Sequence, residues 1–254
     1  MEPVLQVENL SRIFTGEGRK NITAVENVSF CLMPGECLGI IGESGSGKST
    51  LANMITSLLP PSSGRVMLEG ADLTALRGKA LRTARRRIQM VFQMPAGSFD
   101  PRRTLGDGIG EGLRNAGVSR GETKERVAEL LKKCGLDASF AARYPHQVSG
   151  GQCQRAAIAR ALAVDPAVLI CDEATSALDV TIQQEILELL EEMRQGRGGG
   201  LSTLFICHDI ALVQRFCSRV LVMYRGRIVE EGTPEEVIAY PKDAYTKRLI
   251  ESVL

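Results

Sequence analysis

The sequence predicts an α/β fold with a mainly parallel core sheet, and three observations carry this prediction. A glycine-rich segment at 42–50 joins an apolar run of strand length, 37–41, to a helical stretch at 49–59. Beyond residue 164, apolar runs of strand length alternate with helical patterns, which is typical of parallel sheets covered by helices. Between residues 95 and 164 the strand signal fades, so we expect a helical insert of roughly seventy residues to interrupt the sheet.

Strand and helix patterns continue along the rest of the chain. Residues 4–10 and 25–32 alternate between apolar and polar side chains, as half-buried strands do. Pro60 and Pro61 are expected to end the helix that starts at residue 49, because proline lacks the N–H that an interior helical position needs. Further strands are expected at 65–69, 88–92, 167–171, 202–207 and 220–224, and further helices at 123–134, 150–163, 182–194 and 210–217.

The composition is that of an ordinary globular protein. Of the 254 residues, 44% are hydrophobic and 24% are charged, and the length allows one domain or two. The net charge of +1 gives no bulk field that would attract nucleic acid or acidic lipid. No apolar run approaches the ~18 residues that span a bilayer, and residues 1–4 lack the basic-then-apolar pattern of a signal peptide. We therefore expect a cytoplasmic chain that reaches a membrane only through a partner.

The seven cysteines are scattered through apolar runs, without C-x-x-C spacing, and the chain has only two histidines. This pattern favours small buried hydrophobic residues in a reducing compartment, with a metal or iron–sulfur site as the alternative. A basic run at 77–87 has helical spacing, which favours a solvated helix face over a nucleic-acid groove.

The glycine-rich segment fits the phosphate-binding pattern G-x-x-x-x-G-K-[ST] at every fixed position. Its residues are Gly42, Glu43, Ser44, Gly45, Ser46, Gly47, Lys48, Ser49 and Thr50. The glycines let backbone N–H groups converge on an anion, and the start of the following helix adds partial positive charge. Lys48 is expected to reach the β- and γ-phosphates of a nucleotide, and the Ser49 hydroxyl to ligate Mg²⁺. The alternative is a glycine-rich turn that binds nothing.

Two further motifs indicate which kind of nucleotide protein this is. Val148 is followed by Ser149, Gly150, Gly151 and Gln152, and about twenty residues later the apolar run 167–171 ends in Asp172 and Glu173. Together with the phosphate loop, this combination resembles the ATPase subunit of ABC transporters, and the resemblance covers nearly the whole chain. It implies a P-loop NTPase cassette with an N-terminal antiparallel β portion, a core at 1–93 and 164–240, an inserted helical subdomain at 94–163 and a tail at 241–254.

The resemblance also implies a set of catalytic roles. Asp172 would hold Mg²⁺ through water, and Glu173 would orient and partly deprotonate the attacking water, a chemistry that needs mainly positioning and charge stabilisation. Gln93 matches the glutamine that touches Mg²⁺ or water, and His208 matches the histidine that contacts the γ-phosphate. Phe14 lies near the position where an aromatic ring stacks on adenine, although it could equally be a core residue.

In the family, the segment from Ser149 to Gln152 serves the ATP of the opposite subunit, which implies a head-to-tail dimer with two ATP molecules. Ser149 is expected to cap the helix that follows, but capping leaves the double glycine unexplained, since each glycine costs about 1 kcal/mol in a helix. Residues 176–179, which end in Asp179, match the D-loop that crosses this dimer interface.

Three short segments look like the oligopeptide, dipeptide and nickel importer branch of the family. They are 93–102, 143–147 and 241–246, although Asp243 and Ala244 stand where that branch usually has His-Pro. The resemblance implies transmembrane permease subunits and, indirectly, a substrate-binding protein as partners, no nucleic acid, and a place on the inner face of the cell membrane. Because the last cysteine is Cys217, we expect no C-terminal iron–sulfur cluster.

Several alternatives stay open at this point. The rival functions are a soluble ABC ATPase acting on nucleic acid or ribosomes, and an accessory cassette of a phosphonate-degradation complex. The sequence does not fix the cargo, the choice between a homodimer and a pair with a sibling ATPase, or whether ATPase activity requires the permease.

Overall fold

The computed structural model describes residues 2–16, 19–174, 178–195 and 200–252. Contacts between residues divide the chain into two compact units. The first unit combines Met1–Arg85 with Ser202–Leu254, and the second is Arg86–Leu201. These limits differ from those of the predicted core, helical subdomain and tail, and that three-part division stays a prediction.

An antiparallel sheet forms the N-terminal part of the first unit. Its strand order is β2 (Arg19–Leu32), β1 (Leu5–Gly16), β4 (Ser63–Leu68) and β5 (Ala71–Asp72). In β1, Leu5 and Val7 are buried while Gln6 and Glu8, which alternate with them, retain exposure, so one face of the strand packs on the core. The expected antiparallel β portion is confirmed, and both of its long strands extend beyond the predicted ranges.

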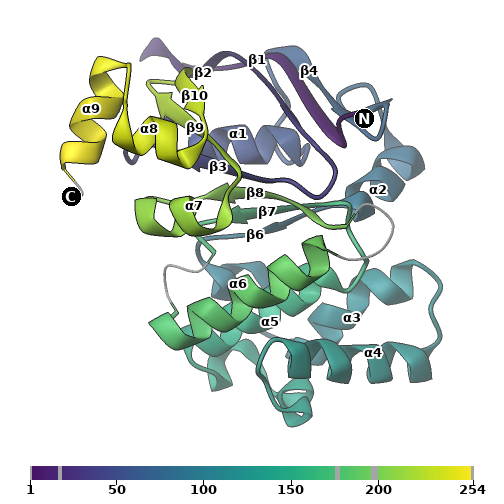
Figure 1. Ribbon diagram of the computed structural model, residues 1–254. Helices are drawn as coiled ribbons and strands as arrows, with labels where there is room; N and C mark the ends of the chain where they lie inside the picture. Colours follow the sequence, from purple (N-terminus) through teal and green to yellow (C-terminus); the bar gives the residue numbers. More distant parts are fainter. Residues whose placement is uncertain (1, 17–18, 175–177, 196–199, 253–254) are drawn as a thin grey trace. The chain divides into compact units, whose positions relative to one another are not determined.

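Parallel strands form the other sheet region of the first unit. β3 (Cys37–Ile41) pairs in parallel with β8 (Ser202–Ile206) and with β9 (Arg219–Tyr224), and β10 (Arg227–Gly232) runs antiparallel to β9. Every residue of β3 and β8 is buried, which explains why both read as continuous apolar runs. Helix α7 (Ile210–Phe216) connects β8 to β9, and α8 (Pro234–Ala239) and α9 (Ala244–Glu251) lie against β10 (Figure 1).

Helix α1 (Lys48–Ile55) is shorter than expected. The Thr56 hydroxyl donates to the carbonyl oxygen of Ala52 over 3.0 Å, and Ser57 has a positive φ of 58°. The chain therefore leaves the helix before the two prolines, and the prediction that Pro60 and Pro61 end it was wrong. Helix α2 (Gly78–Arg87) holds most of the basic run, and all ten of its residues retain solvent exposure, as expected for a solvated face.

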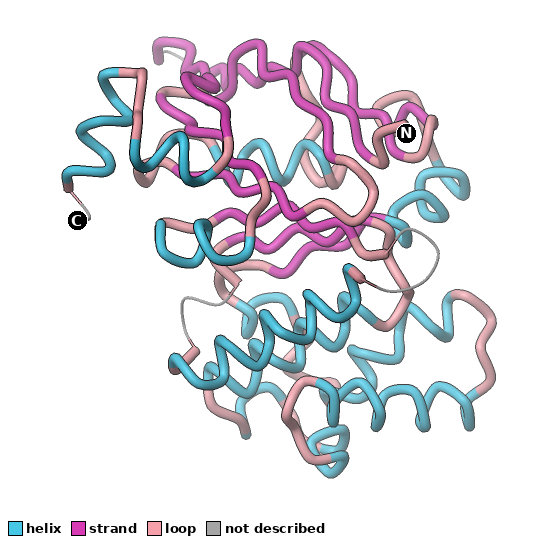
Figure 2. Tube along the Cα trace, in the orientation of Figure 1, coloured by secondary structure: helices cyan, strands magenta, loops and turns pink. Residues whose placement is uncertain are grey.

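The second unit contains a parallel strand pair and a group of helices. β6 (Ile88–Val91) pairs with β7 (Val168–Asp172), and α3 (Leu105–Asn115), α4 (Arg120–Lys133) and α5 (Gly150–Leu162) pack on one another (Figure 2). α6 (Val180–Arg194) follows β7. Short 3₁₀ turns occur at Pro95–Ser98, Ala138–Ala142 and Pro145–Gln147. The absence of strands between residues 95 and 164, all of which are described, agrees with the expected helical insert.

Helix α3 was not predicted, because glycine occupies every second position from Gly106 to Gly112. Packing explains these glycines. A Cβ on Gly108 would lie 2.7 Å from the Phe99 ring, and a Cβ on Gly112 would lie 2.6 Å from Val164. The glycines thus allow close approach of neighbouring segments, at a cost in helix propensity that tertiary contacts offset.

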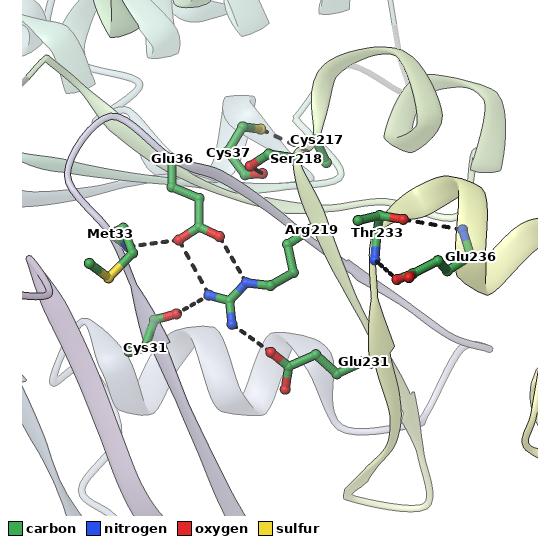
Figure 3. Close-up of polar contacts among 10 residues, drawn as sticks. All are labelled: Cys31, Met33, Glu36, Cys37, Cys217, Ser218, Arg219, Glu231, Thr233 and Glu236. Carbon is green, nitrogen blue, oxygen red and sulfur yellow. Dashed lines mark hydrogen bonds and ion pairs between the residues drawn. The ribbon is translucent and has the colours of Figure 1, made fainter.

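A charged network fixes the start of β9 (Figure 3). The Arg219 guanidinium donates to Glu36 over 2.9 Å, and also to Glu231 and to the carbonyl oxygen of Cys31. Partial burial acts to lower the pKa of Arg219, but the two carboxylates outweigh it and raise that pKa. The network ties β9 to β10 and to the turn before β3.

Six of the seven cysteines are buried, and none of the seven, all of which the structure describes, forms a disulfide, as expected for small buried hydrophobic residues. Within the described part of the chain, no helix is both long enough and apolar enough to cross a membrane.

Candidate functional site

The phosphate loop connects β3 to α1, and its shape depends on two glycines. Gly42 has φ +150°, and a Cβ there would lie 2.2 Å from the carbonyl oxygen of Met223. Gly47 has φ +106°, and a Cβ there would lie 2.3 Å from the carbonyl oxygen of Ala24. Both positions combine a backbone conformation that side chains disfavour with close approach of another chain segment, so only glycine fits.

Lys48 is buried inside this loop, with 6% of its surface exposed. Its ammonium group donates to the carbonyl oxygens of Gly42 and Glu43 over 2.7 and 2.8 Å, and to the Ser46 hydroxyl over 3.3 Å. A buried cation needs such partners, because leaving it unsolvated would be costly. The loop carbonyls therefore fix where the positive charge of Lys48 lies.

The N-terminus of α1 is suited to bind an anion. Gly47 occupies the N-cap position and makes no side-chain capping bond, so no side chain of the cap residue covers the first N–H groups of the helix. Lys48, Ser49 and Thr50 follow Gly47 and form the first turn. The N–H groups of the first helical turn, the helix dipole and the ammonium of Lys48 together form an arrangement that can bind phosphate.

The C-terminal part of the chain contacts the same loop, which the sequence did not reveal. The Gly226 N–H donates to the carbonyl oxygen of Ser46 over 2.8 Å. The N–H of Glu43 donates to the hydroxyl of Tyr245, also over 2.8 Å. These partners are about 180 and 200 residues away in the chain, so no local pattern could have identified them.

Two further predicted site residues belong to the first unit. Phe14 is 39% exposed, and the Arg12 guanidinium lies 4.8 Å from the centre of its ring. The core-residue interpretation of Phe14 is therefore wrong, and an exposed ring is available for stacking. His208 is exposed just beyond β8, and Asp209 after it caps α7 by accepting the N–H groups of Ala211 and Leu212 over 2.9 and 3.2 Å.

The acidic motif lies at the end of β7 in the second unit. Asp172 is the last residue of this buried strand and is only 6% exposed. Glu173 follows with a positive φ of 49°, an uncommon conformation for a residue with a side chain. Such outliers occur at functional sites, where the surrounding structure holds them in place.

The structure brings Glu173 and Gln93 together. The side-chain amide of Gln93 donates a short hydrogen bond to the Glu173 carboxylate, so two residues that are eighty positions apart meet at the carboxyl ends of β6 and β7. This geometry places a carboxylate, which can accept a proton, next to an amide that orients it.

Gln154 on α5 is a residue that sequence reasoning missed. Its side chain is fully buried, and its amide donates to the carbonyl oxygen of Ala174 and, over 3.5 Å, to that of Phe92. Ala174 follows Glu173 and Phe92 precedes Gln93. Gln154 thus connects the helix that starts at Ser149 to both catalytic candidates. Its polar partners are backbone groups of other segments, so no pattern in the sequence identified it.

Ser149 caps α5, as predicted. Its hydroxyl accepts the N–H of Gln152 over 3.3 Å, and the Gln152 side chain accepts the N–H of Ser149 over 3.0 Å, which forms a capping box. A Cβ on Gly150 would meet nothing within 4 Å. Packing within the described chain therefore gives no reason for glycine at this position, which lies in the first turn of the helix beside Gly151.

Asp179 caps α6 by accepting the N–H of Ile182 over 3.1 Å. Of the other residues of the expected D-loop, Ser176 and Ala177 lie outside the described residues. The roles that the resemblance implies for the site residues, including Asp179, stay predictions.

Comparison with known proteins gives a consistent result. A family model described as "ABC transporter" matches residues 25–176. The chain is 46% identical over 256 residues to the probable peptide ABC transporter ATP-binding protein y4tS of Sinorhizobium fredii, covering 98% of this chain and 72% of that protein. It is 46% identical over 259 residues to the glutathione import ATP-binding protein GsiA of Escherichia coli K12, covering 99% of this chain but only 41% of the relative's length.

Solved structures agree with this result. The dimeric ATP-binding cassette MJ0796, bound to ADP and Pi in a post-hydrolysis state, matches with a TM-score of 0.84 and 32% identity, covering 91% of this chain and 98% of that chain. The structure of cbiO1 from Clostridium perfringens, part of the ABC transporter complex cbiONQ, matches with a TM-score of 0.78 and 32% identity, covering all of this chain and 95% of the other. The chain therefore belongs to the ABC transporter family, as one of its ATP-binding ATPase cassettes.

Proposed function

We propose that the chain is the ATP-hydrolysing subunit that powers an importer of peptides. The observation that carries the proposal is the buried Lys48 ammonium, held by the loop carbonyls beside the uncapped N-terminus of α1. This arrangement supplies a fixed positive charge beside a helix N-terminus, which is what nucleotide phosphates require.

Lys48 and the loop N–H groups would bind the phosphates, and Phe14 would stack on adenine. Ser49 and Asp172 would hold Mg²⁺, and Gln93 would contact it or a water that it binds. The donors are hydroxyl, carboxylate and amide oxygens, and a magnesium ion prefers oxygen ligands and keeps several waters, so a single carboxylate suffices. When bound, the ion would neutralise charge on the phosphates.

Glu173 would act as the general base that orients and partly deprotonates the attacking water. The hydrogen bond from Gln93 supports this role, because it orients the carboxylate. His208, exposed at the end of β8, would contact the γ-phosphate.

A second cassette would complete each site. The segment from Ser149 to Gln152 would bind the ATP held by the phosphate loop of the partner, and Asp179 would lie at the interface. The open space around Gly150 supports this interpretation, because the glycine leaves the first N–H groups of α5 accessible to an anion from another molecule. The partner would be a second copy or a sibling ATPase.

Permease subunits would be the membrane partners, and a substrate-binding protein would deliver the cargo. Met94 follows Gln93 with 75% of its surface exposed, which suits a residue in a docking surface. The reported relatives are named for peptide and glutathione import, so a small peptide is the preferred cargo and a nickel or other metal chelate is the second choice. The chain would lie on the inner face of the cell membrane.

The proposed ATP site is tested by changing Lys48 to alanine. Lys48→Ala should abolish tight ATP binding in a titration with the purified chain. The reason is that Lys48 is the only buried cation within the phosphate loop, residues 42–50, all of which the structure describes. ATP affinity and turnover close to those of the unmodified protein would overturn the assignment.

The proposed base and dimer are tested together by Glu173→Gln. Hydrolysis should fall by about 10²–10⁴-fold while ATP binding persists. Because ATP held between two cassettes stabilises only the closed dimer, the variant should elute as a dimer with ATP and as a monomer without it. Adding Ser149→Arg should abolish the dimer. If a sibling ATPase is the partner, the dimer should form only when both proteins are mixed.

A separate experiment distinguishes an importer subunit from a soluble ATPase. It measures ATP hydrolysis by the chain with and without the permease.

A further inference from the structure

The C-terminal helix α9 contributes a side chain to the phosphate loop. Tyr245 is 4% exposed, and its hydroxyl accepts the N–H of Glu43 over 2.8 Å. Burial raises the pKa of Tyr245 above that of an ordinary tyrosine, so the hydroxyl stays protonated and neutral at physiological pH. Both residues belong to the first unit.

Several contacts fix the position of Tyr245. Its ring stacks on Tyr224, at the end of β9, with 4.0 Å between ring centroids and an interplanar angle of 23°. Its N–H donates to the Asp243 side chain over 2.7 Å, which caps α9. The Glu230 carboxylate on β10 accepts the N–H groups of Lys242 and Asp243 over 2.9 and 3.0 Å. The tyrosine is therefore anchored to the same hairpin that carries Gly226.

Glu43 connects this anchor to Lys48. The Glu43 carbonyl oxygen accepts the Lys48 ammonium over 2.8 Å, while the N–H of the same residue donates to Tyr245. The Gly42 carbonyl, which precedes that N–H across one planar peptide unit, also accepts from Lys48 over 2.7 Å. Fixing the Glu43 N–H therefore fixes the Gly42 carbonyl that helps to hold the ammonium.

We propose that Tyr245 is a positioning residue for ATP binding, which acts through the Gly42–Glu43 peptide on the ammonium of Lys48. The proposal rests on the proposed ATP site at the phosphate loop and adds the C-terminal segment 241–246 to it. Because the contact is to the loop and not to Glu173, its loss should weaken nucleotide binding and leave the chemical step nearly unchanged.

The direct test is Tyr245→Phe, which removes the hydroxyl and keeps the ring on Tyr224. A hydrogen bond of this kind corresponds to roughly a 2- to 10-fold change in an equilibrium constant. We expect the KM for ATP, and the dissociation constant measured by displacement of a fluorescent ATP analogue, to rise by roughly this factor, with kcat within about twofold of the unmodified protein. Tyr240→Phe is the matched control, because Tyr240 is 78% exposed in the same region, and it should bind ATP normally.

A second variant separates positioning from a general loss of stability. Glu43→Pro removes the N–H that Tyr245 accepts, so Tyr245→Phe should have little further effect on ATP affinity in that background. Equal losses in both backgrounds would overturn the proposal, even if Tyr245→Phe lowers the thermal midpoint. Unchanged ATP affinity in Tyr245→Phe would also overturn it.

Lys48→Ala, measured in parallel, distinguishes the two possible failures. If Lys48→Ala loses ATP binding and Tyr245→Phe does not, the ATP site stands and the positioning role fails. If neither change affects ATP binding, the proposed site itself fails.

Discussion

The backbone of Glu173 allows a test of whether the site is held in a strained conformation. Its φ of +49° lies in the left-handed region, which costs a residue with a Cβ about 1–2 kcal/mol. Glycine escapes this penalty but has more conformational freedom to lose on folding, by about 0.5–1 kcal/mol. Glu173→Gly should therefore be more stable than Glu173→Ala by about 0.5–1 kcal/mol.

The comparison of these two variants isolates the backbone. Both remove the carboxylate and its hydrogen bond with Gln93, so those losses cancel in the difference. Two control pairs set the scale. Glu69 has φ +48° and should show the same preference for glycine, whereas Glu188 is exposed on helix α6, where glycine should be less stable than alanine by about 1 kcal/mol.

Urea unfolding, monitored by circular dichroism, measures these differences in the free energy of unfolding. The midpoint urea concentrations are compared between variants whose free energy has the same slope with urea. Both Glu173 variants should also lose hydrolysis by about 10²–10⁴-fold, because neither retains the carboxylate that we propose as the base. The expected result is thus a variant that is inactive yet more stable than its alanine counterpart. If glycine is no better than alanine at 173 while it is better at 69, the conformation of Glu173 is not a source of strain and the reasoning fails.

Three further predictions concern thiols, the charged network and the docking surface. Burial raises the pKa of Cys134 to about 12. At pH 8 a thiol reagent should therefore label the partly exposed Cys31 first and Cys134 only after unfolding, as measured by mass spectrometry of the labelled peptides. Arg219→Met should lower the free energy of unfolding by about 1–2 kcal/mol in denaturant titrations, because it breaks the contacts with Glu36 and Glu231, whereas Arg65→Met, in an exposed pair, should change it little. Arg102→Cys should crosslink to a transmembrane subunit in intact membranes, since the Arg102 side chain is 89% exposed; no crosslink in a functional variant would favour a soluble ATPase.

The sequence predicted the elements whose signals are local. The buried parallel strands read as continuous apolar runs, and Ser149 capped its helix as expected, because each pattern depends on residues next to one another. Helix α3 was missed because its glycines lower helix propensity, and the contacts that compensate for them come from distant segments. The end of α1 was misplaced because the chain turns at Ser57, which has a positive φ, before it reaches the prolines.

In the candidate site, too, local patterns could be predicted and contacts with distant segments could not. Its motifs could be identified from the sequence, since each has a fixed spacing of reactive and small residues. The supporting residues could not, because Gln154 and Tyr245 act through hydrogen bonds to backbone groups that belong to other motifs. Such contacts leave no trace in spacing, and they become visible only when the fold brings the segments together.

The phosphate loop illustrates why a motif and a binding site are different things. The loop residues themselves supply the glycines and Lys48, but contacts with distant segments define where those groups lie. Gly42 approaches the carbonyl of Met223, Ser46 accepts the N–H of Gly226, and Glu43 donates to Tyr245. All three partners follow residue 220, so the end of the chain shapes the loop near its start. A chain with an intact motif but a displaced C-terminal hairpin would keep every residue of the pattern and lose the geometry that binds phosphate.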